Sequence, residues 1–210
     1  MLTPRRDDGF TLIELLIAIV ILGVITIPLA DVVISVFDNT DATSARMTLS
    51  HDAQISAAFF ARDVAATGVR DYSGQIANGS VPFKQSIQLN AAYNAGGNTC
   101  GTSATPTALV RFLSDDWDTS QATPVQNTDV VAYYLVPVGS VDELHRLKCT
   151  STSTLDTVVA HNVNPTTPSV TCSTTCTDPS VPQWVKLSFT VTAPSADPYP
   201  IILTGQRRQT

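Results

Sequence analysis

The side chains that could carry out acid–base or nucleophilic chemistry are few in this chain and show no catalytic spacing. His51, His145 and His161 are its histidines, and none lies in a Gly-x-Ser-x-Gly or similar context that would supply a nucleophile to activate. An active site should offer a nucleophile with a base, a cluster of metal ligands or a phosphate-binding loop. We therefore predict that the chain is not an enzyme and needs no cofactor.

Three aspartates, Asp115, Asp116 and Asp118, surround Trp117. Calcium favours such sets of carboxylates, but no glycine turn and no downstream glutamate complete an EF-hand loop here. A solvated turn at the end of a strand is the favoured interpretation. We predict no metal site.

The four cysteines, Cys100, Cys149, Cys172 and Cys176, lie in a part of the chain rich in Ser, Thr, Asn and Pro. An even number of cysteines there is typical of disulfides formed in an oxidising compartment. A zinc site is the alternative, but zinc ligands usually come as closely spaced Cys or Cys/His pairs that these positions do not match. Four cysteines allow three pairings. The closeness of Cys172 to Cys176 favours that pair and leaves Cys100 with Cys149.

Glu14 is an ionisable residue near the start of an apolar run from Phe10 to Ala30. As a helix this run would span roughly 30 Å, the thickness of a bilayer's hydrocarbon core, so we predict a transmembrane helix. A charge at the bilayer centre costs at least about 2.5–3.5 kcal/mol, and such residues are normally paired, functional or able to reach the interface. Arg5 and Arg6 precede the run and predict a cytoplasmic N-terminus with the rest of the chain outside.

A cleavable signal peptide is the alternative for this segment. Its apolar region is usually about 7 to 15 residues, which is shorter than the run seen here. The late candidate cleavage site Pro28-Leu29-Ala30 also matches the small-residue pattern poorly. A helix that remains part of the protein is therefore favoured.

Gly9 is followed by Phe-Thr-Leu-Ile-Glu and then by Leu-Leu-Ile-Ala-Ile-Val-Ile-Leu-Gly-Val. This N-terminus resembles the processing motif of type IV pilins and type II secretion pseudopilins, over both the charged leader and the apolar helix. The resemblance implies that a prepilin peptidase cuts between Gly9 and Phe10 and methylates the new N-terminal Phe10. It also assigns the assembly carboxylate to Glu14. Two aspartates before Gly9 depart from the pattern, since basic or neutral residues are commoner there.

Cleavage before Phe10 would create an α-amino group one helical turn from Glu14. In a low-dielectric environment, that amine and the carboxylate of a neighbouring copy could neutralise each other and set the axial register between subunits. The implied partners are other pilin subunits, bound through the N-terminal helix, together with the prepilin peptidase and the membrane.

Beyond the apolar run the chain turns polar but keeps a helical spacing of apolar residues. We predict one helix from about Phe10 to Thr67, kinked at Pro28 and ended by Gly68. The weakly apolar stretch 38–44 is expected to be looser. The second half of the helix needs a sheet to cover it.

The remainder of the chain shows the spacing of β-strands. Its clearest pattern is the alternation of apolar and polar residues from Val185 to Val191. No helix-length pattern separates the strands, so an antiparallel sheet is favoured. The loop-like stretches are 71–107 and 164–182, the latter with the Cys172–Cys176 pair at its tip. The expected strands are 109–113, 130–136, 157–160, 185–191 and 200–203, with a short one at 86–89 and with 129–136 central in the sheet.

These elements predict the α+β class. Together with the resemblance, they imply a pilin fold, in which a long N-terminal helix, transmembrane in its first half and amphipathic in its second, packs on an antiparallel β-sheet. The expected organisation is a leader peptide at 1–9, a transmembrane helix at 10–30, its amphipathic continuation at 31–68 and an extracytoplasmic β-rich domain at 69–210.

Composition agrees with this organisation and disfavours one class of ligand. A length of 210 residues with 43% hydrophobic residues suits one domain with an appended segment. The net charge of −6 comes from 14% charged residues, and basic residues cluster only as Arg5-Arg6 and Arg207-Arg208. Because nucleic-acid binding relies on many basic contacts to phosphates, nucleic acid is disfavoured as a ligand, though not ruled out.

Two functions from different classes follow. The first is a structural subunit of a type IV pilus-like or pseudopilus filament, held in the cytoplasmic membrane by a single pass and then assembled in the periplasm or outside the cell. Its expected role is minor, because the order of segments after Val130 is similar to minor pilins of the J and W types and because major subunits tend to be shorter. The alternative is a membrane-anchored extracellular binding module. Pilus, pseudopilus and DNA-uptake filament share the motif and are left open.

Overall fold

A computed structural model of the chain describes residues 11–73, 76, 79–120, 122–193 and 196–208. The chain divides into two compact units, Met1–Ser44 and Ala45–Thr210. Helix α1 (Leu12–Ala66) supplies the described structure of the first unit, and its end belongs to the second unit together with all of the strands. The predicted class is confirmed, since a long helix packs through its C-terminal part on an antiparallel sheet.

The stretch 38–44 corrects one prediction, because it is helical rather than loose. Its polar side chains bond back to the preceding turn of the same helix. The Asn39 side-chain amide donates to the Ser35 carbonyl at 2.9 Å, and the Thr40 hydroxyl donates to the Val36 carbonyl at 2.7 Å. Such local bonds satisfy polar side chains without removing any backbone bond from the helix. Low hydrophobicity therefore does not interrupt α1 here.

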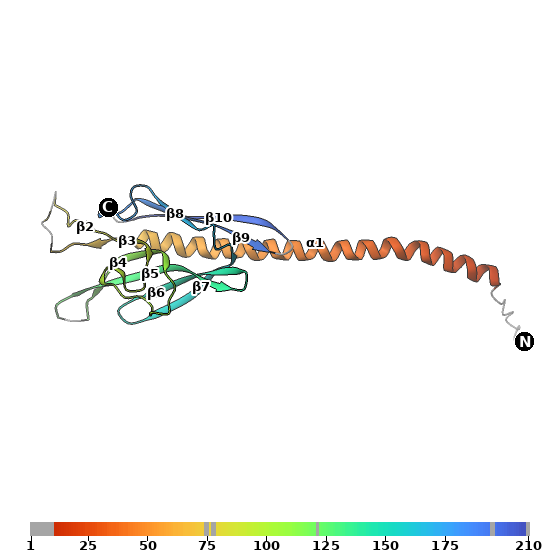
Figure 1. The fold of residues 1–210 in the computed structure, drawn as a ribbon, viewed down its shortest axis with the longest axis horizontal. Coiled ribbons are helices and arrows are strands. Elements are labelled where there is room, and N and C mark those ends of the chain that lie inside the picture. The colour runs from red at the N-terminus through yellow and green to blue at the C-terminus, as the bar shows by residue number, and fades with distance from the viewer. Residues whose placement is uncertain (1–10, 74–75, 77–78, 121, 194–195, 209–210) are drawn as a thin grey trace, which may run out of the picture. The chain divides into compact units, whose positions relative to one another are not determined.

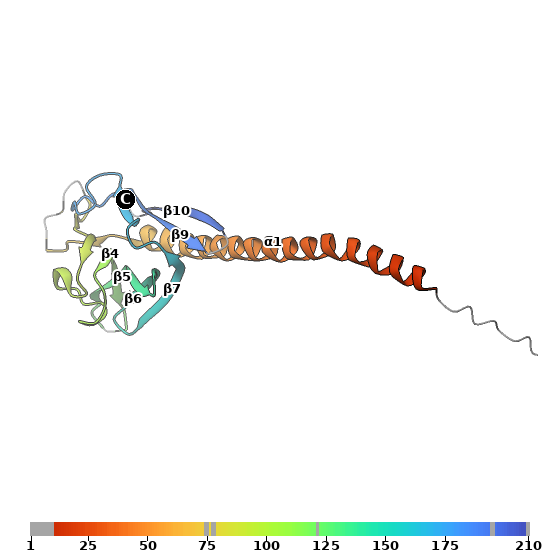
Figure 2. The same cartoon turned by 45° about the vertical axis from the view of Figure 1, so that its right-hand side comes forward.

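The main sheet is antiparallel and has the strand order β10-β9-β7-β6-β5-β4-β3, with β8 paired beside β9, while β1 and β2 form a separate two-stranded sheet. A single residue pair, Val163 with Val191, joins β7 to β9. Around the end of α1, β9 and β10 lie on one side and β4 to β7 on the other (Figures 1 and 2). The strands are β1 (Val69–Arg70), β2 (Phe83–Lys84), β3 (Ile87–Ala91), β4 (Ala108–Asp118), β5 (Val125–Val138), β6 (Val141–Cys149), β7 (Thr154–Val163), β8 (Ser169–Cys172), β9 (Trp184–Ala193) and β10 (Ala196–Gln206).

Every predicted strand is present, and β5 lies inside the sheet as expected. The apolar patterns did not delimit a strand at β6, nor at β1, β2 and β8, which are short. Strand β6 is hidden because the face that it turns toward α1 carries Arg146 next to Leu144, and Arg146 is 2% exposed. A charged residue at a core position breaks the apolar alternation by which strands are recognised. The loop predicted at 164–182 contains β8.

The helix ends at Ala66, close to the predicted stop, and the chain turns directly onto the sheet. Gly68 adopts a φ of 145°, a conformation that side-chain-bearing residues rarely adopt. Its N–H donates to the Leu113 carbonyl on β4 at 2.9 Å, while the Thr67 hydroxyl donates to the Asp63 carbonyl at 2.9 Å. Gly68, which follows the end of α1, is thereby tied to β4, the strand next to the β3 edge of the sheet.

The main core lies between the end of α1 and the inner face of the sheet. Phe60 is its centre on the helix, in edge-to-face contact with Phe112 and Tyr133 at centroid distances of 5.5 Å each. Gly205 on β10 lies so close to Val64 that a Cβ there would fall 2.4 Å from the Val64 Cβ. Only glycine allows this strand to pack so closely against the helix. The main core comprises Leu49, Phe60, Val64, Ile87, Val110, Phe112, Val131, Tyr133, Leu144, Val159, Ala160, Val163, Cys176, Val185, Leu187, Phe189, Val191, Ile201 and Leu203.

A second, smaller apolar cluster involves β4, β5 and β6. It includes both cysteines of one disulfide, so a covalent bond joins the segment 98–107 to this part of the sheet. Its members are Val69, Cys100, Ala108, Leu113, Val130, Ala132, Tyr134, Leu147 and Cys149.

Candidate functional site

Thr11 and Glu14 form a reciprocal set of hydrogen bonds at the start of α1. The Thr11 backbone N–H and the Thr11 hydroxyl each donate to Glu14 Oε2 at 2.9 Å, and the Glu14 N–H donates to Thr11 Oγ1 at 3.4 Å. This arrangement is a capping box, which satisfies backbone N–H groups that have no partner in the first turn of a helix. It holds the carboxylate beside Thr11, the residue that follows Phe10 in the sequence. The predicted processing residues, Gly9 and Phe10, lie outside the described residues.

The helix that follows Glu14 is exposed and apolar. From Leu12 to Phe37 its large hydrophobic side chains are 47–82% exposed. By length and composition this helix is able to cross a membrane. Glu14 is the only charged residue between Leu12 and Ala30. Exposed apolar surface on this scale requires a membrane or a protein partner to cover it.

A family model described as the prokaryotic N-terminal methylation motif matches residues 4–30. The chain carries the prepilin cleavage and methylation motif of type IV pilin-like proteins. The match covers the residues just before the helix and the apolar part of the helix, and the predicted pilin-like α+β fold accompanies it in the rest of the chain. No curated protein and no solved structure matches the chain significantly.

Pro28 lies inside the continuous helix of this pilin-like protein. Proline has no N–H to donate, so the carbonyl four residues before it loses its usual helical bond. Nearby, the Thr26 hydroxyl donates to the Gly23 carbonyl at 3.2 Å. The helix continues through this weakened turn, and the kink expected at Pro28 stays a prediction.

A buried ion pair fixes the end of α1 to the sheet. Arg146 on β6 donates from Nε to Asp63 Oδ2 and from Nη2 to Asp63 Oδ1, both at 2.6 Å. The Tyr133 hydroxyl donates to the same carboxylate at 2.7 Å, and the Arg146 guanidinium lies 4.9 Å from the centre of the Phe59 ring. A bidentate pair with a third donor is the geometry in which a buried ion pair can offset its loss of hydration.

The environment of this ion pair shifts the pKa of both neighbours of Asp63. Burial would lower the pKa of Arg146, but its hydrogen bonds to Asp63 and the charge of Asp63 outweigh burial and raise it. Burial, followed by the charge of Asp63, raises the pKa of the Tyr133 hydroxyl well above its ordinary value. Arg146 therefore stays charged and Tyr133 stays neutral, which is the combination that the hydrogen bonds require.

A second polar connection joins Asp52 on α1 to His161, near the C-terminal end of β7. The His161 backbone N–H donates to Asp52 Oδ2 at 2.9 Å, and the His161 ring Nδ1 lies 3.0 Å from the same oxygen. The Glu143 carboxylate lies between two histidines, 3.3 Å from His145 Nε2 and 4.0 Å from His161 Nε2. His145 in turn contacts Asp156 at 3.1 Å. Carboxylates and imidazoles thus alternate across β6 and β7.

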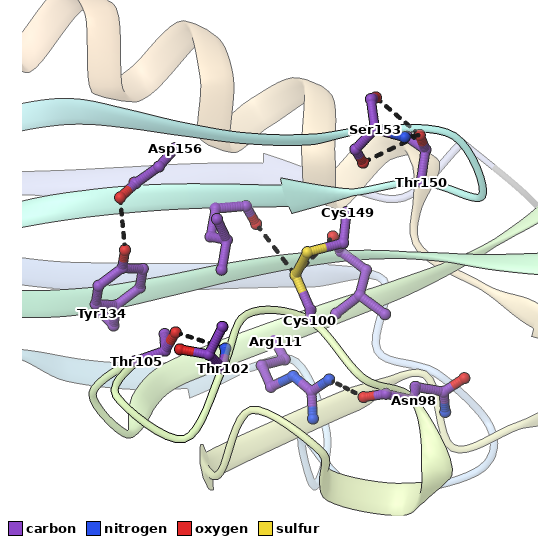
Figure 3. Close-up of a disulfide and its surroundings, with 12 residues drawn as sticks. Asn98, Cys100, Thr102, Thr105, Arg111, Tyr134, Cys149, Thr150, Ser153 and Asp156 are labelled. Carbon is purple, nitrogen blue, oxygen red and sulfur yellow. Dashed lines mark hydrogen bonds between the residues drawn. A yellow bond between two sulfur atoms is a disulfide. The ribbon is translucent and has the colours of Figure 1, made fainter.

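The structure contains the two predicted disulfides. Cys100 is bonded to Cys149, and Cys172 is bonded to Cys176. This is the pairing that the spacing of the cysteines favours. The first bond joins the loop before β4 to the end of β6 (Figure 3), and the second closes a short loop after β8.

Arg111 on β4 is fully buried and has no carboxylate partner among the residues that the structure describes. Its guanidinium instead donates to Gln88 Oε1 at 2.8 Å and to backbone carbonyls of the loop before Cys100, including that of Asn98 (Figure 3). Burial lowers the pKa of this guanidinium. The loop therefore wraps a buried cation with carbonyl oxygens and is held there by the Cys100–Cys149 bond.

The aspartates considered for calcium do not converge on one point. The Asp115 carboxylate accepts hydrogen bonds from the Arg70 backbone N–H at 3.0 Å and from the Gln126 side-chain amide at 2.6 Å. The Asp118 carboxylate accepts one from the Ser120 backbone N–H. Within the described ranges, no group of three His, Cys, Asp or Glu side chains could hold a metal ion. These carboxylates organise the end of the β4–β5 hairpin.

Sequence reasoning did not find Asp63, Arg146, Asp52 or Arg111 as structural contacts. The signal available for Asp63 was its place on the inner side of the amphipathic helix, where an unpaired carboxylate would be costly. No comparable local signal identified its partner, which lies 83 residues away.

Proposed function

We propose that this pilin-like protein is a structural subunit of a type IV pilus-like or pseudopilus filament. A prepilin peptidase cuts it between Gly9 and Phe10 and methylates Phe10, the single helix then holds it in the cytoplasmic membrane, and the same helix assembles it into the filament. The observation that carries this proposal is Glu14, the only charge in an otherwise apolar and exposed span, hydrogen-bonded to Thr11, the residue that follows Phe10 in the sequence. Cleavage supplies the positive α-amino group that such a carboxylate needs as a partner.

We also propose that the subunit is a minor one, related to the J and W types. Its length and the order of its strands after Val130 support this assignment. Copy number tests it directly, since quantitative mass spectrometry of isolated filaments should find this chain outnumbered by a shorter pilin. Equal or greater abundance would assign it to the major subunits.

The mature N-terminus tests the processing step. Mass spectrometry of the chain from membranes should find a protein that begins with N-methylated Phe10. An intact chain that begins at Met1, or one cut at Asp31 as a signal peptide would be, contradicts the proposal.

The Glu14 side chain has two separable roles, and matched variants distinguish them. Glu14→Gln keeps a side chain that suits a capping box but removes the charge, Glu14→Leu removes both, and Thr11→Ala weakens the cap but keeps the carboxylate. If the charge is required for assembly, Glu14→Gln and Glu14→Leu should each lower the amount of chain in sheared filaments by about tenfold or more, while Thr11→Ala assembles.

The contrary pattern has a clear meaning. If Glu14→Gln assembles like the unmodified chain and Thr11→Ala does not, Glu14 is a helix cap and the assembly role assigned to its charge is wrong. A membrane-tethered binding module would tolerate all three changes. Western blots of the membrane fraction control for chain abundance in each variant.

A further inference from the structure

A groove with two basic sides runs along the outer face of the end of α1. Its floor is made of small side chains, and its volume is about 460 Å³. Arg62 on the helix and Arg208 after β10 form its basic sides, and both are exposed. The Arg208 backbone N–H donates to the Ala65 carbonyl at 3.2 Å, which fixes that side of the groove to the helix. The alanines of the floor are Ala58, Ala61, Ala65 and Ala66.

The charges of this groove are not neutralised within the described part of the chain. Arg62 contacts the ring of Phe59 at 5.1 Å, and neither Arg62 nor Arg208 has a described carboxylate within ion-pair distance. Arg207, next to Arg208, lies 4.7 Å from the centre of the Phe83 ring, and its buried Nε and Nη1 have no hydrogen-bond partner. Burial, and then the charge of Arg70, lowers the pKa of Arg207. This end of the protein therefore attracts an anionic partner.

The first unit of the chain carries a surface of the opposite charge. Asp31, Asp38 and Asp41 are exposed, and no basic residue occurs from Asp31 to Ala45. At 3.6 residues per turn these three carboxylates fall within roughly a third of the helix circumference. Ser35 and Ala42 border this face, and Ile34, which is 59% exposed, lies on it between Asp38 and Asp41. The surface is thus an acidic helix face that carries one large apolar side chain and is bordered by small ones.

We propose that the groove binds the acidic helix face of a second copy of this chain. The small side chains of the groove floor leave room for the apolar Ile34 side chain, and the carboxylates beside it then meet the two arginines. Both copies enter from the same membrane in the same orientation, so the helices are parallel. Placing Arg62 against Asp38 and Asp41 shifts one copy past the other by roughly 21 to 24 residues, or about 32 to 36 Å along the helix axis.

This inference rests on the proposed filament function and adds to it. The Glu14 charge pair concerns the membrane-embedded start of the helix, whereas this contact joins the end of one helix to the polar middle of another. The groove suits a protein helix because it has an apolar floor and only two basic sides. Nucleic acid would need a series of basic contacts along its phosphate backbone. Because a low-copy subunit makes this contact only where its copies are consecutive, the tests below use filaments from cells that overproduce this chain.

Charge reversal on the two surfaces tests the contact. The variant Arg62→Glu/Arg208→Glu and the variant Asp38→Arg/Asp41→Arg should each lower the amount of full-length chain in sheared filaments by about tenfold or more. Combining all four changes restores opposite charges and should recover at least half of the assembled chain. The matched control is Lys84→Glu/Lys186→Glu, which alters net charge as the first variant does, at exposed lysines that do not line the groove, and should assemble normally.

The outcomes separate this inference from the proposed function. If the unmodified chain never enters filaments, the proposed function fails and the contact fails with it. If the unmodified chain assembles and both charge-reversed variants assemble equally well, only the contact is wrong. Loss in both variants without recovery in the combined variant also overturns it, since matched charges would not be the cause of the loss.

A photoreactive benzophenone side chain placed at Ala61 gives an independent measurement. In filaments built from two differently tagged copies of the chain, crosslinks should join position 61 of one copy to residues 35–45 of the other. Crosslinks to a different protein alone, or to the β-sheet of the second copy, would contradict the proposed occupant. No crosslink at all in filaments that contain adjacent tagged copies would contradict it as well.

Discussion

Asp63→Ala is expected to lower the free energy of unfolding by about 3–5 kcal/mol, because it leaves the Arg146 guanidinium buried without its counter-charge. Arg146 is 2% exposed, so water cannot replace the lost carboxylate without opening the core. Tyr133 loses the acceptor of its hydroxyl at the same time. Urea unfolding of the full-length protein in detergent, followed by near-ultraviolet circular dichroism, measures the loss.

A second variant decides whether the ion pair is the cause. Asp63→Ala/Arg146→Met removes both charges and should recover most of the lost stability, since an apolar replacement of a whole buried ion pair is often nearly neutral. Asp156→Ala is the surface control. It loses a partly exposed contact with His145 and the hydrogen bond from the Tyr134 hydroxyl, which together should be worth about 1–2 kcal/mol. If the paired variant is as unstable as Asp63→Ala alone, the loss comes from packing rather than from an unpaired charge.

Removal of the Cys100–Cys149 disulfide, as Cys100→Ala/Cys149→Ala, should destabilise the protein by about 4 kcal/mol. The bond closes a loop with a sequence separation of 49, and the unfolded chain gains the corresponding freedom when it is lost. The loop before Cys100 also encloses Arg111 with carbonyl oxygens, so its release exposes a buried cation to water. Equilibrium unfolding in urea measures the change.

The second disulfide is the matched control for this prediction. Cys172 and Cys176 have a sequence separation of 4, and the same relation gives about 2 kcal/mol for Cys172→Ala/Cys176→Ala. The long-loop variant should therefore be the less stable of the two. Equal losses, or the reverse order, would show that loop closure does not dominate and that local packing around each bond does.

Much of the fold follows from local patterns. The apolar run after Gly9, its single carboxylate and the polar but helical continuation identify α1 to within a few residues of its observed bounds. Alternation from Val185 to Val191 identifies β9 because one face of that strand is buried. Local spacing succeeds at these places because each element's own residues display the environment in which it lies.

The two predictions that were wrong, at β6 and at 38–44, share one cause. Strand β6 was missed because Arg146 occupies a core position, and a local pattern cannot show that a charge will be neutralised by Asp63 on a distant helix. The segment 38–44 was expected to be loose because its residues are polar, yet their side chains bond to the turn before them. In both cases the environment of a polar group was decided by a partner that composition does not reveal.

The character of the apolar N-terminal part of α1 can be recognised from the sequence alone. Glu14, the apolar span and the methylation motif act through local chemistry, and so they can be recognised residue by residue. The tertiary structure decided which charges are buried, which are paired and which are left facing outwards. Asp63 meets Arg146 and Arg111 is enclosed by a loop, because the strand order brings residues together from positions that are distant in the chain. Arg62 and Arg208 face outwards with no carboxylate partner among the described residues.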